Sequence, residues 1–155
     1  MKVEFIKPFV NAAYKVLQQE VKVEEIEKGE LNIVESASTS REVTVMIGVT
    51  GDVQGIVLYG LTERTAKLMV SAMTGERVPV FNRLVESAIA EMGNVITGLA
   101  SADLEQAGYV CRITPPTVVV GRGAIISTVS IPKLVIPLVT PLGDLEISVA
   151  LRENR

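Results

Sequence analysis

The segment from about Asn82 to about Ala107 carries apolar side chains at helical spacing over several turns. At about 100° of rotation per residue, these side chains fall into one narrow sector of a helix. The apolar stripe consists of Val85, Ala88, Ile89, Met92, Ile96 and Leu99. A helix with one apolar stripe has to bury that stripe against other elements, and Gly108 is suited to end it. We therefore expect one long helix that packs on the core of the fold.

The first forty residues contain a second amphipathic pattern and then an irregular stretch. Phe5 to Val21 has apolar residues at helical spacing, which predicts a helix whose first turn accommodates Pro8. The residues from Val21 to Ser40 are charged and irregular, so we expect short extended pieces and a loop there.

The next forty residues predict a hairpin and a short helix. Val43 to Val49 and Val53 to Leu61 are β-branched runs, and the connection around Gly51 is typical of a β-hairpin. Thr62 is suited to cap the N-terminus of a helix, and Gly75 is suited to end it.

The part of the chain after the long helix is rich in strand signals. Thr114-Pro115-Pro116 favours extended backbone and blocks a helix. We expect strands at Thr117 to Val120, Ala124 to Ile131, Leu134 to Thr140 and Leu145 to Leu151. The whole pattern predicts an α+β fold.

The composition excludes several kinds of site. The chain has 155 residues, the usual size of one domain, so we expect a single domain over residues 1–155. It has no histidine, which excludes His-ligated zinc, a Ser-His-Asp triad and a phosphohistidine intermediate. The net charge is −3 and the basic residues are scattered, which argues against nucleic-acid binding.

The same composition bears on where the protein works. A single cysteine, Cys111, fits a reducing compartment. The sequence shows no signal-peptide pattern, and it lacks the run of about 20 apolar residues that a membrane span requires. We therefore expect a cytoplasmic protein that neither enters nor crosses a membrane.

The side of the long helix opposite its apolar stripe carries an unusual set of residues. Ser87, Glu91, Asn94 and Gly98 fall close together there, so a carboxylate and a carboxamide stand side by side, three residues apart. A solvated surface explains an arbitrary Glu and Asn, but it does not explain the choice of weak helix formers. The weak helix formers are Gly93, Asn94, Thr97 and Gly98, and the two glycines alone cost about 2 kcal/mol relative to alanine. We interpret these small residues as clearing space for another protein around Asn94.

These residues resemble a known signature. Ser87, Glu91 and Asn94, followed by Pro116, are similar to the pattern of the CheC, CheX and FliY phosphatases, in which Asp or Ser precedes Glu, Asn and a distant Pro. The resemblance extends along most of the chain, including the hairpin around Gly51. It implies the CheC-like α+β fold, in which long helices pack on a largely antiparallel β-sheet.

The first helix distinguishes between members of this family. CheC-like relatives carry a second Glu and Asn motif there, whereas this chain has Val10-Asn-Ala-Ala-Tyr14-Lys15. A single site per chain points to the CheX members. A length of 155 residues also leaves no room for the flagellar-switch segments of FliY.

The resemblance implies an activity and a division of roles. Such a phosphatase hydrolyses the aspartyl phosphate of a CheY-type response regulator; Asn94 would hold the attacking water, and Glu91 would pair with the receiver's active-site lysine. Phosphoryl transfer requires mainly positioning, which a neutral carboxamide can supply. Ser87, Gly98 and Pro116 would support partner binding. The resemblance also implies a homodimer, Mg²⁺ held by the receiver, and no cofactor or metal of the chain's own.

Two other functions remain open from the sequence. A non-catalytic interaction module of the FliM middle-domain type would have the same fold, although Glu91 with Asn94 argues against it. A sensory domain with an apolar ligand pocket is the second, but the sequence lacks the convergent polar groups that such a pocket needs.

The glycine-rich stretch from Gly48 to Gly55 lacks the Lys-Ser/Thr ending of a phosphate loop, so we interpret it as part of the hairpin.

Overall fold

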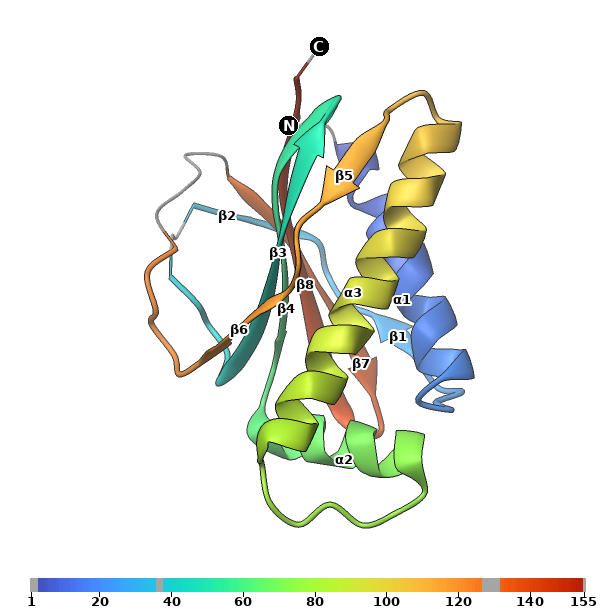
Figure 1. The fold of residues 1–155 in the computed structure, drawn as a ribbon, viewed down its shortest axis with the longest axis vertical. Coiled ribbons are helices and arrows are strands. Elements are labelled where there is room, and N and C mark those ends of the chain that lie inside the picture. Colours follow the sequence, from blue (N-terminus) through green and yellow to red (C-terminus); the bar gives the residue numbers. More distant parts are fainter. Residues whose placement is uncertain (1–2, 36–37, 127–131, 155) are drawn as a thin grey trace.

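The computed structural model describes residues 3–35, 38–126 and 132–154 (Figure 1). The helices are η1 (Val3–Phe5), α1 (Lys7–Gln19), α2 (Glu63–Thr74) and α3 (Arg83–Gln106). The strands are β1 (Glu27–Lys28), β2 (Asn32–Val34), β3 (Val43–Gly51), β4 (Val53–Leu61), β5 (Cys111–Ile113), β6 (Thr117–Val120), β7 (Lys133–Thr140) and β8 (Gly143–Glu153).

These strands form one sheet in which every pair is antiparallel. The order is β1-β7-β8-β4-β3-β5, with β2 also pairing with β7 and β6 with β3. β4 lies near the middle, where Tyr59 is opposite Val45 of β3 on one side and Ile147 of β8 on the other. The sheet and its helices confirm the predicted α+β class.

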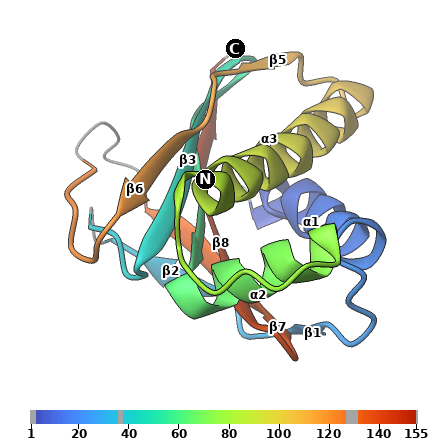
Figure 2. The same cartoon turned by 60° about the horizontal axis from the view of Figure 1, so that its bottom comes forward.

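The helices all lie on one face of the sheet. α1 and α3 run beside each other over that face, and α2 crosses near the end of the sheet where α3 begins (Figures 1 and 2). Alternate strand residues point towards the helices and are buried, as period-2 alternation requires. The buried strand residues include Val45, Ile47, Val57, Tyr59, Leu138, Leu145, Ile147 and Val149. The core therefore lies between this face and the helices.

The helix ends follow their local signals. Oγ1 of Thr62 accepts a hydrogen bond from the backbone N–H of Thr65 at 3.1 Å, and Oδ1 of Asn82 accepts one from Val85 at 3.1 Å. Gly75 ends α2 with a φ of 75°, a left-handed conformation that glycine adopts without strain. These caps confirm the predicted short helix and long helix to within about a residue.

Other predictions differ from the structure in detail. The first helix begins at Lys7 rather than Phe5, because Pro8 occupies its first turn and Phe5 lies in the preceding 3-10 turn. The expected strand Ala124 to Ile131 falls largely outside the described residues, and within them Ile125 forms an isolated bridge with Ser38.

Two short strand regions depend on partners that are distant in sequence. β5 was not predicted; it pairs with the end of β3, where Cys111 is opposite Gly51. The irregular stretch after α1 contains β1 and β2, both paired with β7, which confirms the expectation of short extended pieces.

Among the helices of the described ranges, none is both long and apolar enough to cross a membrane.

Candidate active site

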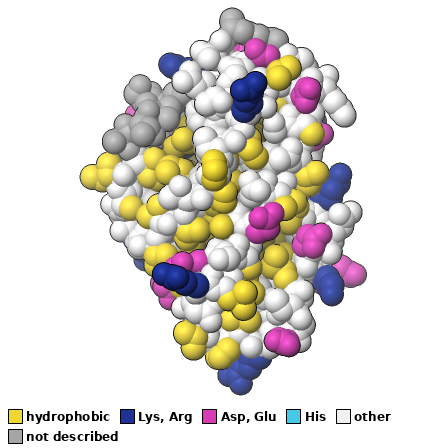
Figure 3. Space-filling view, in the orientation of Figure 1, with side chains coloured by type: hydrophobic (Ala, Val, Ile, Leu, Met, Phe, Trp, Pro, Cys, Tyr) yellow, Lys and Arg dark blue, Asp and Glu magenta, His cyan; other side chains and the backbone are white. Residues whose placement is uncertain are grey.

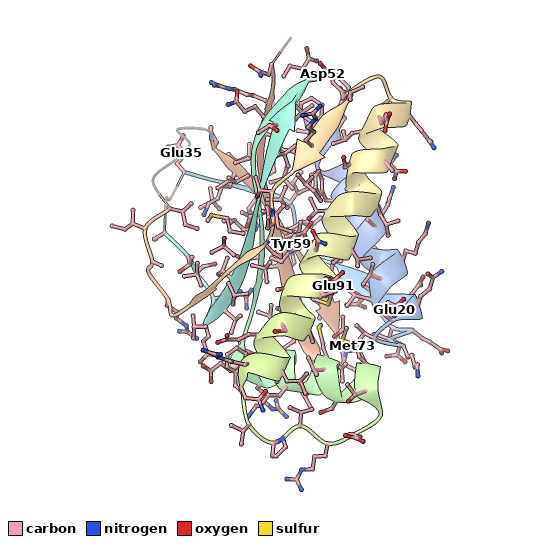
Figure 4. All side chains as sticks on the ribbon, viewed as in Figure 1. Glu20, Glu35, Asp52, Tyr59, Met73 and Glu91 are labelled. Atoms are coloured by element: carbon pink, nitrogen blue, oxygen red, sulfur yellow. The ribbon has the colours of Figure 1, made fainter. Side chains whose placement is uncertain are left out.

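The outward face of α3 brings the predicted site residues together. Ser87, Glu91 and Gly98 are exposed on it, and Asn94 is partly buried. Figure 4 shows Glu91 on the side of α3 that faces away from the sheet. Glu91 and Asn94 are neighbours on this face, since residues three apart lie one above the other on a helix.

The side chains of Glu91 and Asn94 are available to an external partner. Within the described residues, neither side chain has a hydrogen bond or an ion pair. The structure thus presents one acceptor-only carboxylate and, one turn away, one carboxamide that both donates and accepts. Because α3 is a long, well-packed helix, these two groups are held on a rigid support.

The interpretation of the small residues around Asn94 is wrong for two of them. Gly93 is buried, and a Cβ there would lie 3.0 Å from Cγ1 of Val45 and 3.2 Å from Cδ2 of Tyr59. Thr97 is also buried and faces the sheet. Gly98 alone of the glycines in α3 meets open space, since a Cβ there would have no atom within 4 Å. Gly93 and Thr97 therefore serve the packing of α3 on the sheet.

The apolar stripe of α3 is rotated relative to the prediction. Leu99, which was assigned to the core, is 36% exposed. Ala100 and Leu104 are buried instead, on the same side as Gly93 and Thr97. The small side chains at those two positions let the helix settle onto β3 and β4, and this contact turns Leu99 outward.

A buried chain of hydrogen bonds under Asn94 was missed by the sequence reasoning. Oγ1 of Thr97 donates to the carbonyl oxygen of Gly93 at 2.7 Å, and the hydroxyl of Tyr59 lies 2.7 Å from the same Oγ1. A threonine hydroxyl has one hydrogen, so Tyr59 is the donor to Thr97. Burial raises the pKa of Tyr59 well above its usual range, which keeps the phenol protonated. The chain ends at the residue that precedes Asn94.

Pro116 lies in the connection between β5 and β6, the two strands that pair with the same edge of β3. Thr114 anchors this connection, because its N–H donates to the carbonyl of Gly48 at 2.9 Å and its Oγ1 accepts from the N–H of Gly48 at 2.8 Å. β5 and β6 both contact α3. Pro116 is thus half-buried on a segment that flanks α3, whereas the other four residues belong to α3 itself.

Comparison with known proteins identifies the family. The family model described as chemotaxis phosphatase CheX matches residues 43–139, which include Glu91, Asn94 and Pro116 and more than half of the chain. The chain belongs to the CheX family. The resemblance stated from the sequence is thereby confirmed, and the chain is a phosphatase of the CheX type.

Individual CheX proteins support this assignment over nearly the whole chain. The CheY-P phosphatase CheX of Thermotoga maritima is 32% identical over 125 residues, 79% of each chain. The crystal structure of CheX from Desulfovibrio desulfuricans has a TM-score of 0.85 at 26% identity and covers 98% of this chain and 100% of that one. CheX in a CheX-CheY-BeF₃-Mg²⁺ complex from Borrelia burgdorferi has a TM-score of 0.82 at 30% identity, with 98% and 100% covered.

Proposed function

We propose that this CheX-family phosphatase hydrolyses the aspartyl phosphate of a phosphorylated CheY-type receiver and that Asn94 holds the attacking water. One observation carries the proposal: Glu91 and Asn94 stand side by side on the outer face of α3, without partners among the described residues. The substrate class follows from the relatives, of which one is a CheY-P phosphatase and another occurs in complex with CheY.

Asn94 suits the task of orienting water. Its carbonyl oxygen accepts a hydrogen bond from the water, and its NH₂ group donates towards phosphoryl oxygens, without adding negative charge. The water oxygen attacks phosphorus while the bond from phosphorus to the aspartyl oxygen breaks, giving inorganic phosphate and a free carboxylate. Since this transition state needs little covalent assistance, the gain comes from holding the water in line.

Glu91 suits the task of orienting the receiver. It lies about 4.5 Å further towards the N-terminus of α3, one turn from Asn94. We assign it to the receiver's active-site lysine, an ion pair that sets the angle at which the receiver docks. Ser87 and Gly98 would contact the receiver on the same face, and Pro116 would shape the flank. Mg²⁺ is expected in the receiver.

Three further expectations are kept as part of the proposal. We place the chain in the cytoplasm as a single domain over residues 1–155, and we expect a homodimer. Exposed apolar side chains on or beside short edge strands support a contact between copies; these are Ile33 on β2, Val120 on β6 and Ile125, which are 68%, 51% and 79% exposed.

The test is the rate of phosphate loss from a phosphorylated CheY-type receiver, measured with the wild type and with Asn94→Ala. We expect the wild type to accelerate the loss and the variant to be slower by on the order of 10²-fold, because the water is no longer aligned. Binding of the BeF₃⁻-loaded receiver should be retained. Asn11→Ala, an exposed asparagine on α1, is the matched control and should keep full activity.

The same experiment distinguishes the proposed function from the alternative. A non-catalytic module of the FliM middle-domain type would bind the receiver without changing the rate of phosphate loss. That outcome for the wild type would replace the phosphatase proposal, whereas equal rates for the wild type and Asn94→Ala would remove the role of Asn94 alone.

A further inference from the structure

Three helices enclose an apolar groove next to Glu91. Its volume is about 400 Å³, and α1, α2 and α3 each contribute to its walls. The apolar lining consists of Val16, Val70, Met73, Ala88, Met92 and Val95. Figure 3 shows this region as hydrophobic surface between the helices, with acidic side chains beside it and basic side chains further along the same side.

The rim of the groove is acidic. Glu20 at the C-terminal end of α1 and Glu91 on α3 both line it and are both exposed. Figure 4 shows the two carboxylates on α1 and α3, with Met73 of α2 below them. Within the described part of the chain, no lysine or arginine lines the groove. The opening therefore combines an apolar floor with two negative charges.

The helix ends add to this negative potential. Glu20 is the C-cap of α1, and Thr74, which also lines the groove, is the last residue of α2. Each helix C-terminus carries about half a negative charge from its free carbonyl groups. A carboxylate at a helix C-terminus is unfavourable by itself, so a bound cation would offset both the carboxylate charge and the negative end of the helix dipole. The groove thus fits an apolar side chain that is carried next to a lysine or an arginine.

The position of the groove identifies its occupant. Glu91 belongs both to the candidate active site and to the groove wall, and Val95, which is 39% exposed, is the next residue after Asn94. A specific interface covers about 800 Å² on each partner, far more than Glu91 and Asn94 provide. A receiver that places its active site over Asn94 therefore has to cover surface within one turn of it, where the groove begins.

We propose that this groove is a second contact surface for the receiver and accepts an apolar side chain flanked by a basic residue. The inference rests on the proposed function, since it names what the same partner does beside the reacting atoms. Receivers share their active-site residues, so contact at Glu91 and Asn94 discriminates little between them. A groove outside the reacting centre supplies the difference in affinity by which one receiver is selected.

The test is the charge reversal Glu20→Lys, with Glu105→Lys near the far end of α3 as a matched control. Both residues are exposed and both changes alter the net charge equally. We expect Glu20→Lys to raise the Kd of the BeF₃⁻-loaded receiver and the KM for dephosphorylation about tenfold, the effect of losing one close charge contact. The kcat should stay within about twofold, because Asn94 is untouched.

A second variant tests the apolar contact in the groove separately from the effect of charge on receiver binding. Val95→Ser removes apolar surface without changing charge, and Val110→Ser, at a valine 58% exposed after α3, is its control. We expect Val95→Ser to raise the Kd several-fold and Val110→Ser to leave the Kd unchanged. Thermal unfolding of each variant shows whether it remains folded.

The outcomes distinguish the two proposals. A wild type that binds the receiver without hydrolysing its phosphate overturns the proposed function, while the Kd series still tests the groove. A Kd that responds equally to Glu20→Lys and Glu105→Lys overturns the groove proposal and leaves the phosphatase activity standing. If Glu20→Lys alters self-association instead of receiver affinity, the groove binds a second copy of the chain and the proposal is wrong.

Discussion

The hydroxyl of Tyr59 lies 2.7 Å from Oγ1 of Thr97, and this buried contact joins the middle of the sheet to α3. Oγ1 of Thr97 in turn donates a hydrogen bond to the carbonyl oxygen of Gly93. Hydrogen bonds in such a chain strengthen one another in a medium of low dielectric constant. The rotation of α3, and its distance from the sheet at the turn that carries Asn94, are therefore set by polar groups as well as by apolar packing.

Removing the hydroxyl of Tyr59 should weaken this anchor. In Tyr59→Phe, Thr97 loses its donor, and in Thr97→Val, Tyr59 is left with an unpaired hydroxyl; each change should lower the free energy of unfolding by about 1–3 kcal/mol. The double variant removes both polar groups, so it should be less destabilised than the sum of the single changes. Urea titrations of all four proteins measure the coupling, and simple additivity would contradict it.

High pH should act through the same phenol. The folded pKa of Tyr59 is raised by burial, whereas the unfolded pKa is near the ordinary value of about 10. The stability that this difference contributes is fully present below pH 10 and is lost as the pH rises further. The unfolding free energy of the wild type, relative to Tyr59→Phe, should fall by about 1.4 kcal/mol per pH unit above 10. Urea titrations at pH 8 to 11 test this, and a constant difference would disprove it.

The two glycines of α3 should respond oppositely to alanine. Gly98→Ala adds a methyl group in open space and should stabilise the protein by about 1 kcal/mol through helix propensity. Gly93→Ala would bring its Cβ to 3.0 Å from Cγ1 of Val45, which is fully buried. Overpacking in a buried contact typically costs about 1–3 kcal/mol, and because most of that range lies above the gain of about 1 kcal/mol in helix propensity, we expect net destabilisation.

Thermal unfolding compares these two variants directly. A difference of about 2 kcal/mol corresponds to roughly 4–8 °C in Tm for a chain of this size. Dephosphorylation adds a second readout, because a methyl group at Gly98 would hinder close approach of a receiver and raise KM although the protein is more stable. If both variants shifted Tm in the same direction, the assignment of Gly93 to the sheet contact would be wrong.

Elements with local signals were predicted correctly. Thr62 and Asn82 cap helices through their own side chains, and the strands around Gly51 are joined by a short connection, so the information for each lies within a few residues. The signature of Glu91 and Asn94 is local as well, since helical periodicity alone places two residues three apart on one face.

Features that depend on a distant partner were not predictable in this way. β5 is three residues long and becomes a strand because the edge of β3 offers it hydrogen bonds. Met73 and Glu20 come from different helices, and nothing in their local sequence indicates that they line one groove with Glu91.

The orientation of α3 shows where the two kinds of information meet. Periodicity predicted a helix from about Asn82 to about Ala107, with Asn94 away from its apolar side, and the structure has this helix at Arg83–Gln106. A wheel weighted by hydrophobicity misplaces the buried sector by roughly 60°, because it counts Leu99 as core and Gly93 and Thr97 as surface. Close packing on Val45 and the bond to Tyr59 decide that rotation, since a helix approaches a sheet most closely where its side chains are small. The residues of the candidate site are thus readable along the chain, whereas the rotation of α3, its buried anchor and the groove beside it arise from packing between segments far apart in sequence.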